Sequence, residues 1–125
     1  MQDSDATRRL EGRQRLCHRA AIGAAGTREC RLGGGDWPLR VIVVRNGERY
    51  RAFRNVCPHA GTALNLKPHT FLNRDGTALV CTTHGALFDR DSGACLAGPC
   101  AGRSLTAYDV DVDSDGVLWI TLPRS

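Results

Sequence analysis

Two short segments of the sequence each place a cysteine close to a histidine. The first contains Cys57 and His59 in a CxH pattern, and the second contains Cys81 and His84 in a CxxH pattern. A tight loop can point both side chains of such a pair at one centre, so two facing loops would supply two thiolates and two imidazoles. This donor set fits either tetrahedral zinc or an iron-sulfur cluster in which two imidazoles replace two thiolates on one iron.

The spacing of these residues favours the iron-sulfur cluster. Structural zinc sites usually begin with two cysteines that are separated by a few residues. Here each loop instead mixes one cysteine with one histidine. Each loop can then give its cysteine to one iron and its histidine to the other, as a binuclear cluster requires.

Short apolar runs separated by turn residues predict a β-rich fold in which hairpins lead into both loops. Asn46-Gly47, between the apolar runs 41–44 and 50–53, predicts a type I′ hairpin whose second strand leads to Cys57. A hairpin around 74–76 is expected to end at Cys81. Further hairpins are expected around 91–93 and 113–116, and a further strand at 28–32.

Length and composition predict one domain. A chain of 125 residues with 42% hydrophobic content can bury one core but is too short for an additional catalytic domain. Residues 1–14 are polar and are expected to form a flexible arm, with a single domain over 15–125 and its cluster-binding part at about 55–102. No segment resembles a signal peptide or is long enough to span a bilayer, which predicts a cytoplasmic protein without membrane attachment.

The net charge of +4 is concentrated in the first half of the chain, where 12 of the 17 basic residues precede Cys57. The arginines near the start could contact nucleic acid or an acidic partner. They lack interleaved aromatic residues and any nucleic-acid-binding motif. We therefore expect a solvated arm and no nucleic-acid partner.

The segments CPHAG at 57–61 and CTTHGALFD at 81–89 resemble the Rieske 2Fe-2S motif. The hairpin before the first loop, the FDRDSG segment, Gly98-Pro99 and the final LTAYDVDVDSDGVLWI are also similar to Rieske ferredoxins and to Rieske domains of ring-hydroxylating oxygenases. The resemblance implies an all-β Rieske (ISP-like) fold, with an antiparallel β-sandwich or barrel-like base and a small cluster-binding subdomain of two loops. It also implies one 2Fe-2S cluster per chain, with Cys57 and Cys81 on the inner iron and His59 and His84 on the outer, redox-active iron.

Two departures from respiratory and photosynthetic Rieske proteins bear on the reduction potential. Those proteins have an extra cysteine in each loop, and the two form a disulfide clamp; here Thr62 and Thr83 take these positions. They also have a serine and a tyrosine that donate hydrogen bonds to sulfur, where this sequence has Ala86 and Phe88. Because such hydrogen bonds raise the potential, we predict the low end of the Rieske range of about −150 to +300 mV.

The remaining histidines and two of the cysteines have simpler interpretations. Cys17 and His18 are expected to be a buried thiol beside a surface imidazole, and Cys30 a core thiol. The segment between the two loops is longer than in most of the family. His69 lies in this segment and is expected to be a surface residue, although a third imidazole near the cluster is an alternative.

Cys95 and Cys100 form a CxxxxC pattern in a loop that is expected to cover the cluster. A plant-type ferredoxin would need another cysteine where Arg103 stands, so that cluster type is excluded. Buried thiols, a redox-responsive pair and a local disulfide remain open. A reducing cytosol favours thiols that pack against the cluster.

The sequence predicts an electron carrier or oxidoreductase component with no catalytic residues of its own. Outside the four ligands only His18 and His69 remain, too few for a 2-His-1-carboxylate iron site, and no glycine-rich motif for a flavin or nicotinamide is present. The main hypothesis is a Rieske-type ferredoxin that passes single electrons from a flavin- or NAD(P)H-dependent reductase to an oxygenase or other terminal oxidoreductase.

Two alternatives come from other classes of protein. One is a small accessory subunit of a larger oxidoreductase such as a nitrite reductase-like complex, and the other is a zinc-bound structural module. For the main hypothesis, docking is expected on an apolar surface around the imidazoles, formed by Pro58, Ala60, Leu64, Leu87 and Pro99.

Overall fold

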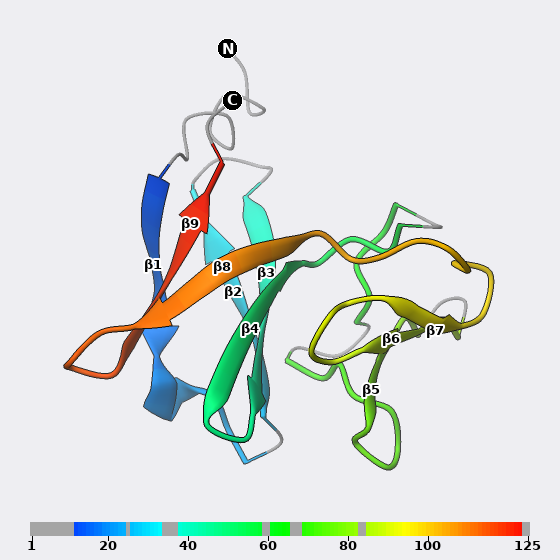
Figure 1. Cartoon of the computed structure of the whole chain (residues 1–125), viewed down its shortest axis with the longest axis horizontal. Coiled ribbons are helices and arrows are strands. Elements are labelled where there is room, and N and C mark those ends of the chain that lie inside the picture. The colour runs from blue at the N-terminus through cyan, green and yellow to red at the C-terminus, as the bar shows by residue number, and fades with distance from the viewer. Residues whose placement is uncertain are drawn as a thin grey trace.

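The computed structural model describes residues 12–24, 26–33, 38–58, 61–65, 69–82 and 85–123 (Figure 1). Every regular element in these ranges is a β-strand except one short 3-10 helix, and none is a helix that could cross a membrane. The elements are β1 (Gly12–His18), η1 (Arg19–Ala21), β2 (Thr27–Leu32), β3 (Leu39–Asn46), β4 (Arg49–Arg54), β5 (Ala78–Val80), β6 (Leu87–Asp89), β7 (Cys95–Ala97), β8 (Ala107–Val112) and β9 (Val117–Leu122).

Six strands form a curled antiparallel sheet in the order β1-β9-β8-β4-β3-β2, and β5-β6-β7 form a smaller antiparallel sheet beside it (Figure 1). This confirms the expected all-β fold with a barrel-like base and a small second part. The two sheets pack closely where the turn before β7 meets β4. A Cβ atom on Gly93 would lie 2.8 Å from the Phe53 ring, so this contact requires glycine.

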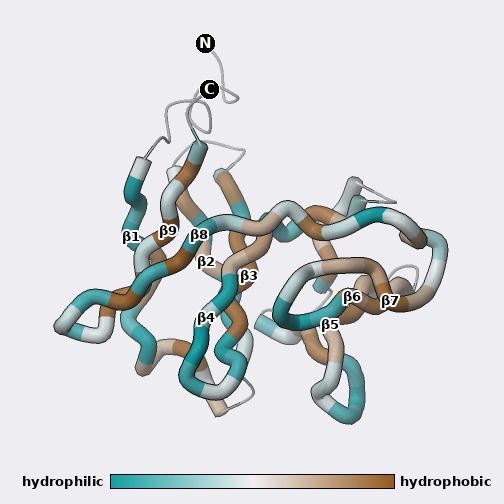
Figure 2. The backbone as a smooth tube through the Cα atoms, in the orientation of Figure 1, coloured by the Kyte–Doolittle hydropathy of each residue, from teal (hydrophilic) through white to brown (hydrophobic). Residues whose placement is uncertain are grey.

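Strand β3 lies between two hydrophobic cores. The run Val41–Val44 is fully buried and appears as a hydrophobic stretch of β3 in Figure 2. Alternate side chains of a strand point to opposite faces. Val41 and Val43 accordingly pack in the core inside the curled sheet, whereas Ile42 and Val44 pack in the core under the small sheet. This explains why the run is continuous rather than alternating.

The hairpin between β3 and β4 exists as predicted, but its turn is displaced by one residue. Asn46 pairs with Arg49, so the loop consists of Gly47 and Glu48. Among the described non-glycine residues only His69 has a positive φ angle, so Gly47 at +68° is the one loop residue in that region. A positive φ at the first loop position alone is the requirement of a type II′ turn, and the predicted type I′ turn is therefore wrong.

The expected flexible arm is too long at its C-terminal end. Residues 12–14 belong to β1, where Gly12 pairs with Leu122 and Gln14 with Ile120 of β9. Backbone pairing with the last strand orders a segment that has no apolar periodicity of its own. Residues 1–11 lie outside the described part of the chain.

Candidate metal centre

The first cysteine loop follows β4 and is closed by two backbone hydrogen bonds. The N–H of Cys57 donates to the carbonyl of Thr62 at 2.7 Å, and the N–H of Gly61 donates back to the carbonyl of Cys57 at 2.7 Å. Gly61 has a φ of +74°. This left-handed conformation favours glycine and allows the chain to turn back on itself within a few residues.

The second loop follows β5 and has the same hydrogen-bond pattern at the same offsets. The N–H of Cys81 donates to the carbonyl of Ala86 at 2.9 Å, and that of Gly85 donates to the carbonyl of Cys81 at 2.7 Å. Gly85 has a φ of +72°. The two cysteines are therefore presented by two turns with the same closing bonds, as a site with two similar halves requires.

The two cysteines share one hydrophobic core and are suited to bind metal. Cys57 and Cys81 are both 0% exposed, belong to the core under the small sheet, and are not in a disulfide. Two buried sulfur ligands on matched turns fit the sulfur half of a 2Fe-2S donor set. The other two predicted ligands, His59 and His84, lie outside the described residues. Within the described ranges no group of three or more metal-binding side chains occurs.

The two loops are joined to each other through Leu64. Its carbonyl accepts hydrogen bonds from both the backbone N–H of Thr82, at 3.0 Å, and the Thr82 hydroxyl, at 2.9 Å. Its own N–H donates to the side-chain oxygen of Asn55 at 2.8 Å. Leu64 is fully buried, so its expected place on the docking surface is wrong, and Ala60 lies outside the described residues. Leu64 instead links the loops.

Asn55 connects this link to the large sheet. Its side-chain N–H groups donate to a carboxylate oxygen of Glu29 and to the side-chain oxygen of Asn65, both at 2.9 Å. Glu29 also forms an ion pair with Arg40. Burial alone would raise the pKa of Glu29, but the hydrogen bonds from Arg40 and Asn55 outweigh it and hold that pKa below its usual value. An ionised, nearly buried carboxylate on β2 thus orients the residue that supports the first loop.

Comparison with known proteins identifies the family. Residues 12–112 match the family model of the Rieske 2Fe-2S domain. The chain belongs to the Rieske family. Its cofactor is accordingly a 2Fe-2S cluster, which carries single electrons. No curated protein sequence gives a significant match.

Solved structures of low sequence identity share the Rieske fold of this chain. The ferredoxin of carbazole 1,9a-dioxygenase from Nocardioides aromaticivorans IC177 is 24% identical, with a TM-score of 0.66, and covers 90% of this chain and 99% of its own. A chain from a complex of reduced oxygenase and oxidized ferredoxin of carbazole 1,9a-dioxygenase is 19% identical, with a TM-score of 0.70, and covers 93% and 98%. The terminal oxygenase from Novosphingobium sp. KA1 is 19% identical, with a TM-score of 0.77, and covers 97% of this chain but only 32% of its own.

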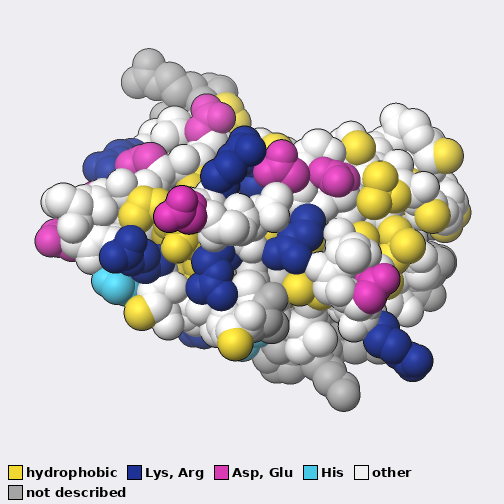
Figure 3. All heavy atoms as spheres, turned by 60° about the horizontal axis from the view of Figure 1, so that its bottom comes forward, with side chains coloured by type: hydrophobic (Ala, Val, Ile, Leu, Met, Phe, Trp, Pro, Cys, Tyr) yellow, Lys and Arg dark blue, Asp and Glu magenta, His cyan; other side chains and the backbone are white. Residues whose placement is uncertain are grey.

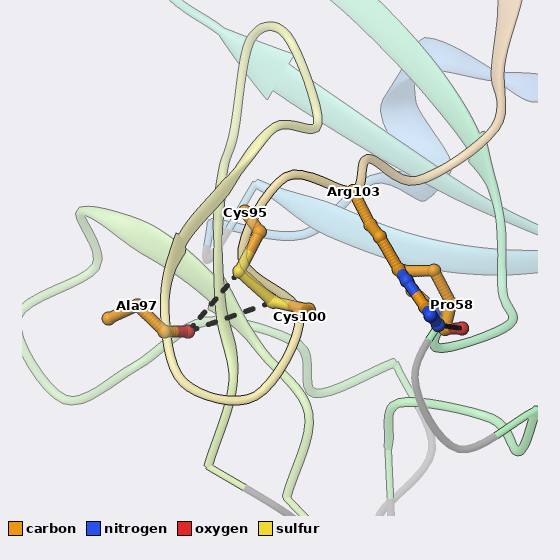
Figure 4. Close-up of a disulfide and its surroundings, with 5 residues drawn as sticks. All are labelled: Pro58, Cys95, Ala97, Cys100 and Arg103. Carbon is orange, nitrogen blue, oxygen red and sulfur yellow. Dashed lines mark hydrogen bonds between the residues drawn. A yellow bond between two sulfur atoms is a disulfide. The ribbon is translucent and has the colours of Figure 1, made fainter.

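A third loop of this Rieske domain is closed by a disulfide. Cys95, at the start of β7, is bonded to Cys100, with their Cα atoms 5.8 Å apart (Figure 4). This distance lies within the ordinary range for disulfides. The expectation of two reduced thiols is therefore wrong. It rested on the assumed compartment, whereas the turn after β7 brings the two residues to bonding distance.

The third loop contacts both cysteine loops. Gly98 lies so close to the second loop that a Cβ atom on it would be 2.8 Å from the Cα of Ala86. The Arg103 side chain points away from the disulfide and donates a 2.8 Å hydrogen bond to the carbonyl of Pro58 in the first loop (Figure 4). Gly98, inside the disulfide-closed loop, thus packs against the second half of the candidate site, and Arg103, three residues beyond Cys100, reaches the first.

The other residues considered in the sequence take structural places. Ala86 and Phe88 are 0% exposed, and neither side chain can donate a hydrogen bond. His69 is exposed, as expected, and its ring Nδ1 accepts a 3.1 Å hydrogen bond from the backbone N–H of Glu29. This bond, like that from the Thr27 hydroxyl to the His69 carbonyl, fixes the segment between the loops to β2.

Proposed function

We propose that the chain is a Rieske-type ferredoxin that passes single electrons from a flavin- or NAD(P)H-dependent reductase to a terminal oxygenase. The observation that carries this proposal is the pair of matched turns that present Cys57 and Cys81 in one core and are joined through Leu64. Support for the oxygenase partner comes from the carbazole 1,9a-dioxygenase ferredoxin, whose fold is similar over 99% of its length, and from the complex of such a ferredoxin with its oxygenase.

We propose Cys57, His59, Cys81 and His84 as the four ligands. The two cysteines would hold one iron from within the core, and the histidines of the same loops would hold the other. A 2Fe-2S cluster bound there takes up and releases one electron at a time. The chain's own residues bury the sulfur ligands, fix the two turns relative to each other and exclude water from the cysteine side.

The proposed docking surface lies at the small-sheet end of the molecule. Hydrophobic side chains gather on this end in Figure 3, whereas charged side chains are more frequent over the large sheet. Leu96 is 59% exposed, Pro99 is exposed, and Pro58 and Leu87 are partly exposed. A small apolar face of this kind suits the weak, short-lived contacts of electron-transfer partners.

Two further expectations stay part of the proposal. One is a single domain, expected over residues 15–125 and extended by β1 to residue 12, with its cluster-binding part at about 55–102. The other is a cytoplasmic location. The Cys95–Cys100 disulfide counts against this location, because cytosolic reductants keep most thiols reduced.

The proposal is tested on the purified protein by metal analysis, spectroscopy and electron transfer. We expect two irons and two acid-labile sulfides per chain, a Rieske-type EPR signal after dithionite reduction, and rapid oxidation of the reduced protein by a terminal oxygenase. A colourless, EPR-silent protein with stoichiometric zinc would contradict the cluster. Stable co-purification with a large oxidoreductase subunit, without exchange, would favour the accessory-subunit alternative over a ferredoxin.

The potential is expected to respond to two buried side chains. Replacing Ala86 by Ser and Phe88 by Tyr introduces hydroxyl donors at positions where related proteins hydrogen-bond to sulfur. One net hydrogen bond of about 1 kcal/mol corresponds to about 43 mV for a one-electron couple, so each substitution should raise the midpoint potential by tens of millivolts. Protein-film voltammetry measures the shift. Ala52→Ser, an equally buried alanine in the other core, is the control and should leave the potential unchanged.

A further inference from the structure

The two edge strands of the large sheet bring a second pair of cysteines together. In the sheet order β1 and β2 lie at opposite edges, and the curl of the sheet brings these edges to the same core. Cys17 of β1 and Cys30 of β2 are each 8% exposed in this core, and neither is in a disulfide. The two side chains belong to the same core and line the same pocket at the seam between the strands.

An irregularity in β1 turns Cys17 toward this seam. The pairing of β1 with β9 shifts register between Arg15 and Cys17. A regular strand would point Leu16 and Cys17 to opposite faces, but here both are buried in the same core. The bulge therefore places the Cys17 sulfur opposite Cys30.

The two thiols differ in chemical character. A hydrogen bond from Cys30 lowers the pKa of Cys17 to about 7, against the effect of burial and with help from the positive charges of Arg28 and Arg15. The same interaction, together with burial, raises the pKa of Cys30. Cys17 is thus the more readily ionised of the two thiols and the attacking group, and Cys30 is the protonated thiol beside it.

A solvent-accessible pocket gives access to this pair. It has a volume of about 460 Å³ and is lined by both cysteines and by the cationic side chains of Arg15, Arg28 and Arg31. His18, on the same wall, is exposed and its Nε2 lies 2.9 Å from the carbonyl of Asp115. The acidic residue of this wall, Glu29, is paired with Arg40 and, at 3.9 Å, with Arg31. Arg15 and Arg28 supply the remaining positive charge of the wall. The pocket therefore favours an anionic reactant next to a thiolate.

We propose that Cys17 and Cys30 form a second redox site, independent of the cluster, that reduces small anionic disulfides. In the first step the Cys17 thiolate attacks one sulfur of the reactant, the reactant's S–S bond breaks, and one thiolate leaves. In the second step Cys30 loses its proton to that thiolate and attacks the Cys17 sulfur, which releases the second thiolate. Two protein thiols are oxidised to one disulfide between β1 and β2, and one disulfide is reduced to two thiols.

The test uses the cluster-loaded protein and two small disulfides that differ in charge. The protein is treated anaerobically with 3,3′-dithiodipropionate, which is anionic, or with 2-hydroxyethyl disulfide, which is neutral, and the cluster spectrum is followed to show that the loops stay loaded. Peptide mapping by mass spectrometry after alkylation should show a Cys17–Cys30 link. For each reagent, the rate of reaction with the protein is divided by its rate with a free cysteine derivative. This relative rate should be at least tenfold higher for the anionic reagent than for the neutral one, and added salt should remove the difference.

A matched pair of variants separates the two roles. Cys30→Ser should accumulate the mixed disulfide on Cys17, and Cys17→Ser should leave Cys30 unmodified. Three outcomes would overturn the proposal. In the first, both thiols of the wild-type protein can still be alkylated after the free cysteine derivative has fully reacted. In the others, Cys30 reacts as fast in Cys17→Ser as Cys17 does in the wild-type protein, or the neutral reagent reacts as fast as the anionic one. Mapping of the wild-type protein decides the matter even if a variant fails to fold.

Discussion

Replacement of Cys57 or Cys81 by alanine is expected to leave a folded protein that binds no 2Fe-2S cluster. Both side chains are fully buried, and each is the only sulfur donor of its turn. Loss of one leaves an iron one ligand short in a core that admits no water to replace it. Iron and acid-labile sulfide should fall from two each to near zero per chain, and the visible absorption should disappear.

Replacement of His59 or His84 by alanine belongs to the same prediction but gives a different signature. The thiolates remain, so some iron can be retained, but the Rieske-type EPR signal should be lost because it depends on imidazole ligation of one iron. A variant that keeps this signal would show that the histidine in question is not a ligand.

Two control variants separate loss of a ligand from loss of packing. Val44→Ala removes buried apolar volume from the same core as Cys57 and should lower stability, at a typical cost of about 1 to 3 kcal/mol, without releasing the cluster. His69→Asn removes the remaining imidazole between the loops while keeping a residue that tolerates its φ of +60°. Both variants should retain full iron and sulfide. Cluster loss in Val44→Ala would mean that lost packing alone explains the cluster loss in Cys57→Ala and Cys81→Ala.

Local signals in the sequence predicted much of the fold and the loop positions. Glycines at turns and the apolar runs beside them indicated four hairpins. Three are present as paired strands, and at the fourth, around 74–76, only β5 is a strand and an isolated bridge joins Leu72 to Leu79. The two cysteine motifs indicated two similar loops, and the backbone bonds of Cys57 and Cys81 confirm that they are alike. These features depend on residues close together in sequence, and for that reason a sequence pattern can reveal them.

Features that depend on distant partners were missed. Strand β1 exists because Gly12 pairs with Leu122 at the other end of the chain, which no local periodicity can show. The sequence gives no sign that Leu64 is buried, because its contact with Thr82 joins two loops that are far apart in sequence. Leu64 was therefore expected on the surface. The only sequence feature that points to Asn55 is its position two residues before Cys57. Its supporting role depends on its hydrogen bond to Glu29, which is distant in sequence.

Replacement of Asn55 by Asp is expected to open the first loop. Asn55 is 1% exposed, and its amide donates to Glu29 and Asn65 while its oxygen accepts from the backbone of Leu64. A carboxylate keeps the last bond but faces two acceptors, one of them charged. Removing buried donors and adding a like charge should lower the free energy of opening this loop by about 3 kcal/mol. The backbone around Leu64 should then exchange its amide hydrogens more than about 100-fold faster, as measured by mass spectrometry.

A double-mutant cycle assigns this cost to Glu29. Glu29→Gln alone loses the charge that pairs with Arg40 but leaves an oxygen that accepts from Asn55. In the double variant the amide of residue 29 can donate to the new carboxylate, so the bond is restored with its direction reversed. The double variant should therefore be at least about 1 kcal/mol more stable than the sum of the single effects. Asn73→Asp is the control. Asn73 is partly buried, its side-chain oxygen accepts a hydrogen bond from the backbone N–H of Thr77, and a carboxylate keeps this bond, so the change should have little effect.

The pH dependence distinguishes repulsion from loss of shape. The pKa of Glu29 in the folded protein lies below its ordinary value of 4.5, so its contribution to stability is complete above that value and is lost only as the pH falls through the lower, folded pKa. Between pH 5 and 7 the wild-type contribution is therefore constant. The carboxylate of Asn55→Asp, placed beside Glu29, has its pKa raised in the folded state, so its penalty is largest at pH 7 and shrinks as it takes up a proton toward pH 5. A ratio of exchange rates between variant and wild type that stays constant over this range would show that charge repulsion with Glu29 is not what opens the loop.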